Sequence, residues 1–299
     1  MPRRVTLPGR IFESDAVPAM TRPRLNTGWL LVLPLLGLVL ALFLGPIVNI
    51  LWLSVTDPEP GLGNYGALFT SDSLGKILWT TLRICVICTV ISVILGYSIA
   101  YAMVHAGDTD RNRMLSLLLV SFWISVLVRT FSWLMLLGRN GLVNNGLEAL
   151  GLISAPIPFM RNELGVLIGM VHYMVPYAVL PILASMQAMD ARVVSASRSL
   201  GATGAQTFWR IYLPLTRPGV VAAALLVFII NLGFYVVPAV LGGGKVLMVA
   251  EYISVQVLIT LRWGTAAMLA ALLLFGVLAL LFLMSRFMKL STVFGGART

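Results

Sequence analysis

Charged residues are scarce in this sequence. Of its 299 residues only 11% are Asp, Glu, Lys or Arg, while 59% are hydrophobic. A soluble domain usually carries roughly a quarter charged residues, so a globule of this composition would lack the polar surface that keeps it dissolved. The shortage argues against a soluble protein and predicts a single membrane domain with lipid as its solvent.

Residues that carry catalysis or bind metals are also few. Cys85 and Cys88 are the only cysteines, and although C-x-x-C spacing can indicate redox or metal chemistry, both lie in an apolar run without a second ligand pair. We interpret them as small packing residues. His105 and His172 stand alone, and no H-E-x-x-H or G-x-S-x-G motif occurs. We therefore expect no catalytic residues, no metal site and no cofactor bound by this chain.

Long hydrophobic runs, by contrast, are abundant. A hydrocarbon core of roughly 30 Å needs about 20 apolar residues in a helix, and backbone groups in lipid must pair with one another, which favours helices. The runs of this length predict an all-α membrane protein with six transmembrane helices. They are Gly28–Val55, Ile77–Val104, Met114–Leu137, Leu164–Ala188, Pro218–Leu241 and Thr265–Met288.

Basic residues outnumber acidic ones by 21 to 11, and their distribution predicts the orientation of the spans. If the N-terminus is cytoplasmic, fourteen Lys and Arg residues lie on the cytoplasmic side and seven lie elsewhere, as the positive-inside rule requires. Both termini are then cytoplasmic, with an N-terminal segment over 1–27, a membrane domain over 28–290 and a tail over 291–299. Since the positive charge is a topology signal, we expect no nucleic acid partner.

A polar stretch between the fourth and fifth spans, about 190–213, has its own helix signals. Asp190 can cap a first short helix, and Gly201 suits the turn or C-cap that follows it. Thr203 and Gln206 form a T-x-x-Q capping box for a second short helix. Two short helices that meet at a glycine on the cytoplasmic face predict a compact knob. Its apolar groups need a partner, either another protein or the bilayer surface.

This stretch resembles the EAA loop of ABC importer permeases, whose pattern is E-A-A-x-x-x-G and, further on, I-x-L-P. The glycine and the I-x-L-P tail are present, whereas serines replace the glutamate and the second alanine. The matching residues are Ser195, Ala196, Ser197, Gly201, Ile211, Leu213 and Pro214. Other segments resemble the spermidine/putrescine-type branch of this family, among them Gly63-Asn64-Tyr65, Arg129-Thr130-Phe131-Ser132-Trp133 and Leu241-Gly242-Gly243.

The resemblance implies a type I ABC importer (MetI-like) transmembrane domain in a bacterial inner membrane, forming half of a translocation path. It implies three kinds of protein partner: an ABC ATPase dimer, a second and homologous permease subunit, and a periplasmic substrate-binding protein. ATP and Mg²⁺ would bind to the ATPase, since Ala239 and Val246 stand where a Walker A motif in this chain would need Gly and Ser or Thr. The residues implied in ATPase coupling are Ser195, Ala196, Ser197, Leu200, Gly201, Ala202 and Phe208.

Polar residues within or near the spans are candidates for the translocation path or its gate. Arg129 and Trp133 lie in the third predicted span. We expect Arg129 to make a gating ion pair, to make a structural ion pair within the bundle, or to extend its charged end to the membrane interface. Trp133 suits the outer aromatic belt. Asn231 and Tyr235 lie four apart, on one face of the predicted fifth helix, for contact with a cationic substrate or for helix–helix hydrogen bonds. Glu251, the lone carboxylate between the last two spans, pairs with Arg129, meets a cationic substrate or faces water.

The favoured function is a permease subunit of an ATP-driven importer for a small organic solute, and the resemblance implies polyamines such as putrescine and spermidine. The alternatives are a related permease for an opine, an amino-acid-like compound or a phosphonate. A secondary transporter is less favoured because no internal repeat is evident, and a membrane-embedded enzyme lacks its motifs.

Overall fold

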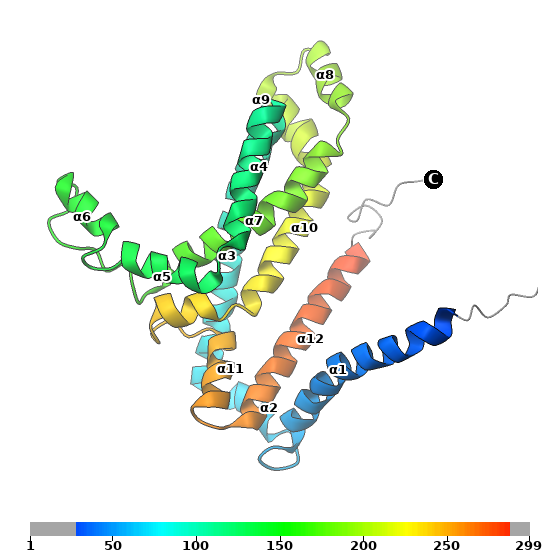
Figure 1. Cartoon of the computed structure of the whole chain (residues 1–299), viewed down its shortest axis with the longest axis vertical. Coiled ribbons are helices and arrows are strands. Elements are labelled where there is room, and N and C mark those ends of the chain that lie inside the picture. Colours follow the sequence, from blue (N-terminus) through cyan, green and yellow to red (C-terminus); the bar gives the residue numbers. More distant parts are fainter. Residues whose placement is uncertain (1–27, 288–299) are drawn as a thin grey trace, which may run out of the picture. The chain divides into compact units, whose positions relative to one another are not determined.

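The computed structural model describes residues 28–287, and every regular element in that range is helical (Figure 1). The chain divides into two units, residues 1–48 and 49–299. The predicted N-terminal segment, 1–27, and the predicted tail, 291–299, lie outside the described residues. In chain order the elements are α1 (Gly28–Thr56), α2 (Gly63–Thr70), α3 (Asp72–His105), α4 (Asp108–Trp123), α5 (Val126–Leu136), α6 (Leu142–Ala149), α7 (Glu163–Gln187), α8 (Ala191–Ser199), α9 (Gly204–Thr207), the π-helical turn η1 (Phe208–Tyr212), α10 (Leu213–Leu232), the π-helical turn η2 (Pro238–Gly242), α11 (Val249–Leu258) and α12 (Trp263–Phe287).

Among the described helices, five are long and apolar enough to cross a membrane. They are α1, α3, α7, the continuous helix from α9 through α10, and α12. A sixth crossing exists if α4 and α5 count as one bent span. The all-α membrane architecture is therefore confirmed, and two of the six predicted spans differ from the expected straight helices.

The third predicted span, Met114–Leu137, is not one helix. α4 ends at Trp123, α5 begins at Val126, and their axes differ by 97°. Ile124 and Ser125 between them leave helical geometry, with ψ angles of 124° and 139°. Hydropathy does not reveal this break because the apolar run continues across it.

The fifth predicted span, Pro218–Leu241, is also interrupted. α10 ends at Leu232 with Gly233 as its C-cap, and η2 begins at Pro238. In a continuous helix a proline ring clashes with the carbonyl of the residue four positions earlier. The chain accordingly leaves helical geometry at Gly233 and is still non-helical at Phe234, the residue four before Pro238.

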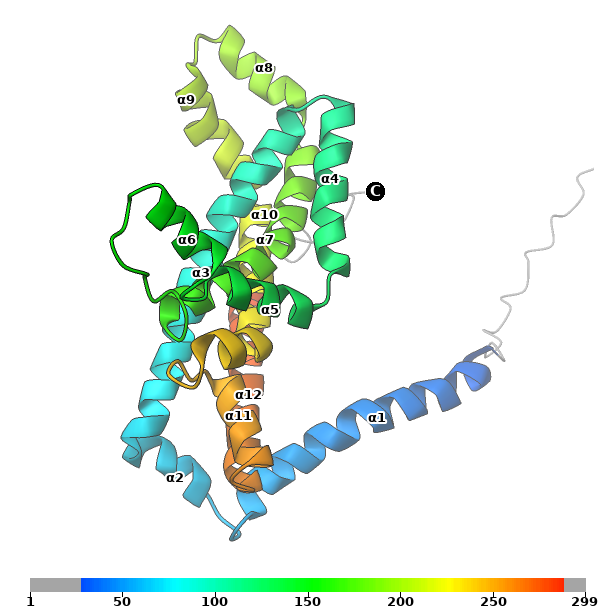
Figure 2. The same ribbon diagram turned by 60° about the vertical axis from the view of Figure 1, so that its left-hand side comes forward.

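The main core lies where α3, α7 and α10 pack together, as Figures 1 and 2 show. Small residues permit the close approach. A Cβ added to Gly96 of α3 would lie 2.7 Å from the Ala178 Cβ of α7, and one added to Gly219 of α10 would overlap Ser185 of α7. Buried apolar side chains of this core include Ile84, Met103, Met170, Met174, Ile182, Ala223 and Val227.

A smaller cluster joins α2, α11 and α12 to the first part of α3, at the end of the bundle away from α8 and α9 (Figure 1). The Val249 N–H of α11 donates to Thr81 Oγ1 of α3 at 2.9 Å. The Gly264 N–H of α12 donates to the Asp57 carboxylate at 2.6 Å. These bonds fix α11 against α3, and the start of α12 against the loop that follows α1. The buried apolar residues of the cluster are Leu74, Val249, Met268 and Leu269.

Gly96→Ala tests the packing of α3 on α7. The added methyl group meets Ala178 and the α7 backbone, so we expect the free energy of unfolding to fall by about 1–3 kcal/mol. Gly276→Ala on α12 is the matched control, because nothing lies within 4 Å of its added Cβ and alanine favours a helix over glycine by about 1 kcal/mol. Thermal denaturation of the purified protein in detergent measures both. Equal stability of the two variants would contradict the close approach.

Candidate functional site

The stretch from 190 to 213, here called the α8–α9 segment, folds locally as the sequence predicts. The Asp190 side chain accepts a backbone hydrogen bond in the first turn of α8. At the other end Gly201 has a φ angle of +83°, and its N–H and that of the next residue donate to two carbonyls in the last turn of α8. This pair of bonds is a Schellman C-cap, in which glycine takes the left-handed position without Cβ strain. The predicted turn at Gly201 is thus confirmed.

The start of α9 and its link to α8 are equally well defined. Thr203 Oγ1 accepts from the Gln206 N–H at 3.3 Å, and Gln206 Oε1 accepts from the Thr203 N–H at 2.9 Å, which confirms the capping box. The buried hydroxyls of Ser197 and Thr207 lie 3.1 Å apart and hydrogen-bond across the two helices. Ser197 stands where the EAA pattern has alanine, so the replacement adds a bond that ties the segment into one body.

The accessible surface of this segment is partly apolar. Leu200 is 89% exposed and Trp209 is 66% exposed. Burial of a large apolar side chain stabilises by about 1.5–3 kcal/mol, so these two residues favour a partner. Among the predicted coupling residues, Ser197 is buried, and those at least partly accessible besides Leu200 are Ser195, Ala196, Gly201, Ala202 and Phe208.

Phe208 differs from the other predicted coupling residues because it packs against α3. Its ring centroid lies 5.9 Å from that of Tyr101 on α3 and 6.2 Å from that of Tyr212. Tyr212 in turn meets the His105 ring at 5.9 Å. These rings join the segment to α3 and to the start of α10. Sequence reasoning missed the cluster, although Tyr97, Tyr101 and His105 recur every four residues and so share one helix face.

The break in the third span is bridged by Arg129 of α5. Its guanidinium donates to the carbonyls of Ser121 and Ile124, the second at 3.2 Å, and lies 5.0 Å from the ring centroid of Tyr173 on α7. Arg129 is only 7% exposed. A cation at a helix C-terminus satisfies carbonyls that lack an intrahelical partner and interacts favourably with the helix dipole. The contacts favour the structural interpretation, and within residues 28–287 no ion pair joins Arg129 to Glu251.

Asn231 and Tyr235 do not share a helix face, contrary to the prediction, because α10 ends at Leu232. Asn231 is fully buried, where its amide donates to Thr89 Oγ1 at 3.5 Å and its carbonyl accepts from the Cys88 thiol at 3.7 Å. These bonds connect α10 to α3, as the helix–helix alternative requires. Tyr235 lies in the break after α10 and is 43% exposed, so its ring remains accessible.

Glu251 is buried, with 7% exposure, at the third residue of α11, a short helix outside the candidate spans. Its carboxylate accepts a hydrogen bond from the Met248 N–H, the contact that a glutamate makes in a capping box. The second oxygen, Oε2, has no partner among the described residues. Burial raises the pKa of Glu251, and the Met248 N–H lowers this pKa to a smaller extent. Glu251 therefore does not face water, and one oxygen is available to a cation or a proton.

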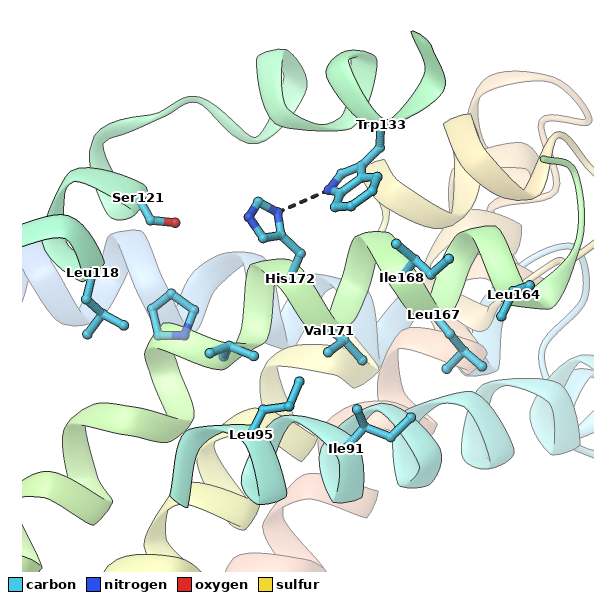
Figure 3. A pocket seen from close by; sticks show the side chains of 12 residues that line it. Ile91, Leu95, Leu118, Ser121, Trp133, Leu164, Leu167, Ile168, Val171 and His172 are labelled. Carbon is cyan, nitrogen blue, oxygen red and sulfur yellow. Dashed lines mark hydrogen bonds between the residues drawn. The ribbon is translucent and has the colours of Figure 1, made fainter. Parts of the chain in front are cut away.

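Trp133 of α5 is hydrogen-bonded within the bundle. Its indole N–H donates to His172 Nδ1 of α7 at 3.1 Å (Figure 3). The pair borders a cavity of about 520 Å³ between α3, α4, α5 and α7. Apart from this pair and Ser121, the lining is aliphatic, which suits an apolar occupant and not a charged one.

Comparison with known proteins identifies the family. The family described as "Binding-protein-dependent transport system inner membrane component" matches residues 92–289, more than half of the chain. The chain belongs to this family. It is therefore an inner-membrane permease of a binding-protein-dependent transport system, and the predicted location in the inner membrane is confirmed.

Individual relatives agree with the family. The spermidine/putrescine transport system permease protein PotB of Haemophilus influenzae is 36% identical over 200 residues, which cover 67% of this permease and 70% of PotB. PotB of Escherichia coli K12 is 34% identical over 69% of this permease and 76% of PotB. A bacterial ABC transporter that imports the acidic polysaccharide alginate contains a chain that matches with a TM-score of 0.70 and 16% identity, over 87% of this permease and 93% of that chain. The likeness to that chain concerns the fold alone, which is the MetI-like fold of ABC importer permeases.

Arg129→Gln tests the bridge across the third span. The variant removes charged hydrogen bonds to the end of α4, and we expect the free energy of unfolding to fall by about 1.5–3 kcal/mol. Arg129→Lys keeps the charge without the planar fork and should lose less. Arg139→Gln, at an exposed site just beyond α5, is the control and should be close to neutral. Thermal denaturation in detergent ranks the stabilities of the three variants. An Arg129→Gln permease of normal stability that fails to transport would instead support a gating role.

Proposed function

We propose that this permease is one of two membrane subunits of an ATP-driven importer of polyamines such as spermidine and putrescine. The observation that carries the substrate class is the similarity to PotB proteins, at 34–36% identity over about two thirds of the chain. Tyr235 and Glu251 are the residues of this chain that fit a cationic solute. An accessible ring attracts an ammonium group by about 0.5–2 kcal/mol, and Glu251 Oε2 offers a negative charge once the carboxyl is ionised.

The proposed ATPase partner binds the α8–α9 segment. The Lys and Arg distribution predicts that this segment lies on the cytoplasmic side, where an ABC ATPase dimer would hold ATP and Mg²⁺. Leu200 and Trp209 supply exposed apolar contacts on a body of fixed geometry, and such anchors carry much of the energy in protein interfaces. The missing glutamate at Ser195 leaves apolar contact as the main source of affinity.

The coupling mechanism follows from how that segment is attached. In our proposal, closure of the ATPase dimer on ATP moves the α8–α9 segment as a unit, because the cap at Gly201 and the Ser197–Thr207 bond keep it stiff. The rings around Phe208 pass the motion to α3 and α10. The path then opens outward, and hydrolysis returns it to the inward state.

Two further partners complete the proposed importer. A second, homologous permease subunit would form the other half of the path. A periplasmic substrate-binding protein would deliver the solute at the end of the bundle that carries α2 and the turn between α11 and α12. The alginate transporter has been solved in complex with a periplasmic protein bound to an alginate pentasaccharide, which supports a partner of this kind.

An uptake assay tests the substrate and the energy source. The permease, reconstituted in liposomes with its partner permease, ATPase and binding protein, should accumulate labelled putrescine or spermidine only when the ATPase is supplied with ATP. Uptake should survive collapse of the proton gradient. An opine, an amino acid and a phosphonate serve as competing solutes. Preference for one of them would overturn the polyamine assignment, and uptake driven by the proton gradient without ATP would overturn the energy source.

Leu200→Glu tests the docking surface. A charge in place of an exposed leucine should abolish apolar contact with the ATPase without changing the fold of the permease, because Leu200 makes few contacts within the chain. We expect a loss of ATPase affinity of about tenfold or more, measured by co-purification of the complex. Leu62→Glu is the matched control, since Leu62 is also highly exposed but precedes α2 at the other end of the bundle. Equal co-purification of both variants would argue against docking at Leu200.

A further inference from the structure

The two interrupted spans meet at a single side chain of α7, that of Tyr173. The guanidinium carbon of Arg129, in the first turn of α5, lies 5.0 Å from the centroid of the Tyr173 ring. Phe234, in the break after α10, places its own ring centroid 4.7 Å from the same centroid, with 40° between the two planes. Cation–π contacts and tilted aromatic pairs are both attractive at such distances. One ring on α7 therefore contacts both broken spans.

Further contacts hold the segments after the two breaks close together. α5 is bonded to α7 a second time, through the indole of Trp133 and the ring of His172. η2 lies against α7 at Gly169, where an added Cβ would lie 2.5 Å from a side-chain carbon of Leu241. Gly169 and Tyr173 are four residues apart and share a face of α7. α5 and η2 also pack against each other, and Figures 1 and 2 both show the gold segment that contains η2 beside α5. Neither segment is positioned independently of the other.

The contact with Phe234 also bears on Tyr235, the next residue, whose ring is 43% exposed. Phe234 and Tyr235 lie between α10 and the next helical turn, outside any helix. The backbone there is not held by a regular ladder of hydrogen bonds, so side-chain contacts have a larger share in fixing its position. Tyr173 therefore positions the backbone from which the Tyr235 ring extends.

We propose that Tyr173 is a positioning residue that joins α5 to the break after α10, so that both segments move together during transport. A displacement of Arg129 with α5 is passed by the Tyr173 ring to Phe234. Tyr235, next in the chain, then changes position in step with the bend of the third span. The linkage between the segments rests on the contacts alone, whereas its use in transport rests on the proposed function.

Distance measurements between spin labels test the linkage. In the assembled importer, labels on unnatural amino acids replace Ser132 of α5 and Lys245, just after η2, and each distance is measured to a third label at Ser98 of α3. All three positions are exposed in this chain. We expect both distances to change between the nucleotide-free importer and the importer trapped with a non-hydrolysable ATP analogue. Tyr173→Leu removes the ring, so the two changes should no longer occur together.

The outcomes of this experiment separate the linkage from the proposed mechanism. Two distances that still change together in Tyr173→Leu would overturn the linkage, and so would a change in only one distance of the normal permease. A normal permease in which neither distance responds to the ATP analogue would overturn the proposed ATP-driven motion together with the linkage.

Uptake of labelled spermidine gives the functional readout. Tyr173→Leu should lower the uptake per ATP hydrolysed by about tenfold, with the amount of assembled importer unchanged. Tyr173→Phe keeps the ring and both of its contacts, so it should restore the normal ratio. Tyr252→Leu is the matched control, because Tyr252 is also partly buried but packs against the smaller cluster. An equal loss in Tyr252→Leu, or no recovery in Tyr173→Phe, would overturn the positioning role.

Phe234→Leu covers the case in which Tyr173→Leu fails to fold. Phe234 lies outside any helix and is only partly buried, so a smaller side chain should be tolerated there. This variant removes the contact of the break with the Tyr173 ring and should separate the two distances in the same way. Distances that still change together in Phe234→Leu would overturn the linkage.

Discussion

In hydrocarbon a backbone carbonyl without a hydrogen-bond donor is costly, and this constraint governs how a transmembrane helix can break. α4 ends inside the bundle, and the guanidinium of Arg129 supplies the donors that its last carbonyls lack. Because that cation is also held over the Tyr173 ring, α5 is fixed at its angle to α4. The Trp133–His172 bond and the apolar cavity both depend on this angle. Capping of α4 therefore accounts for the burial of Arg129 within a span.

In the α8–α9 segment the backbone groups at the helix ends are satisfied by local capping motifs, whereas the end of α4 depends on a side chain from another helix. The Schellman cap at Gly201 and the capping box at Thr203 close one helix and open the next within a few residues. The Ser197–Thr207 bond then joins the two helices. The second helix of the segment continues directly into α10, and the aromatic cluster around Phe208 holds the segment against α3. A rigid segment of this kind can transmit a displacement to the spans without changing its own conformation.

This contrast explains what the sequence predicts and what it does not. Caps and turns depend on neighbouring residues, so the sequence predicts the caps at Asp190 and Gly201 and the capping box at Thr203. Apolar length likewise gave the membrane class and the approximate spans. The breaks at Ser125 and Phe234 lie within apolar runs, and the direction of Phe208 is set by α3, more than a hundred residues earlier in the chain. These features depend on tertiary contacts, which hydropathy and spacing do not encode.

Glu251 is a buried carboxylate in α11, the helix that follows the broken fifth span. A buried carboxylate is destabilising unless each oxygen has a donor or a counter-charge, and Met248 serves only one of them. Within the described residues Oε2 has no partner, so the group is stable either as a neutral acid or in contact with a cation from outside the chain. An arriving ammonium group would favour the ionised form, and the proton would leave as the cation binds. Since Tyr235 lies in the break that precedes α11, the same interruption that removed it from the face of Asn231 leaves its ring free for a cation. The accessibility of the Tyr235 ring thus depends on the break after α10 and not on a continuous helix face.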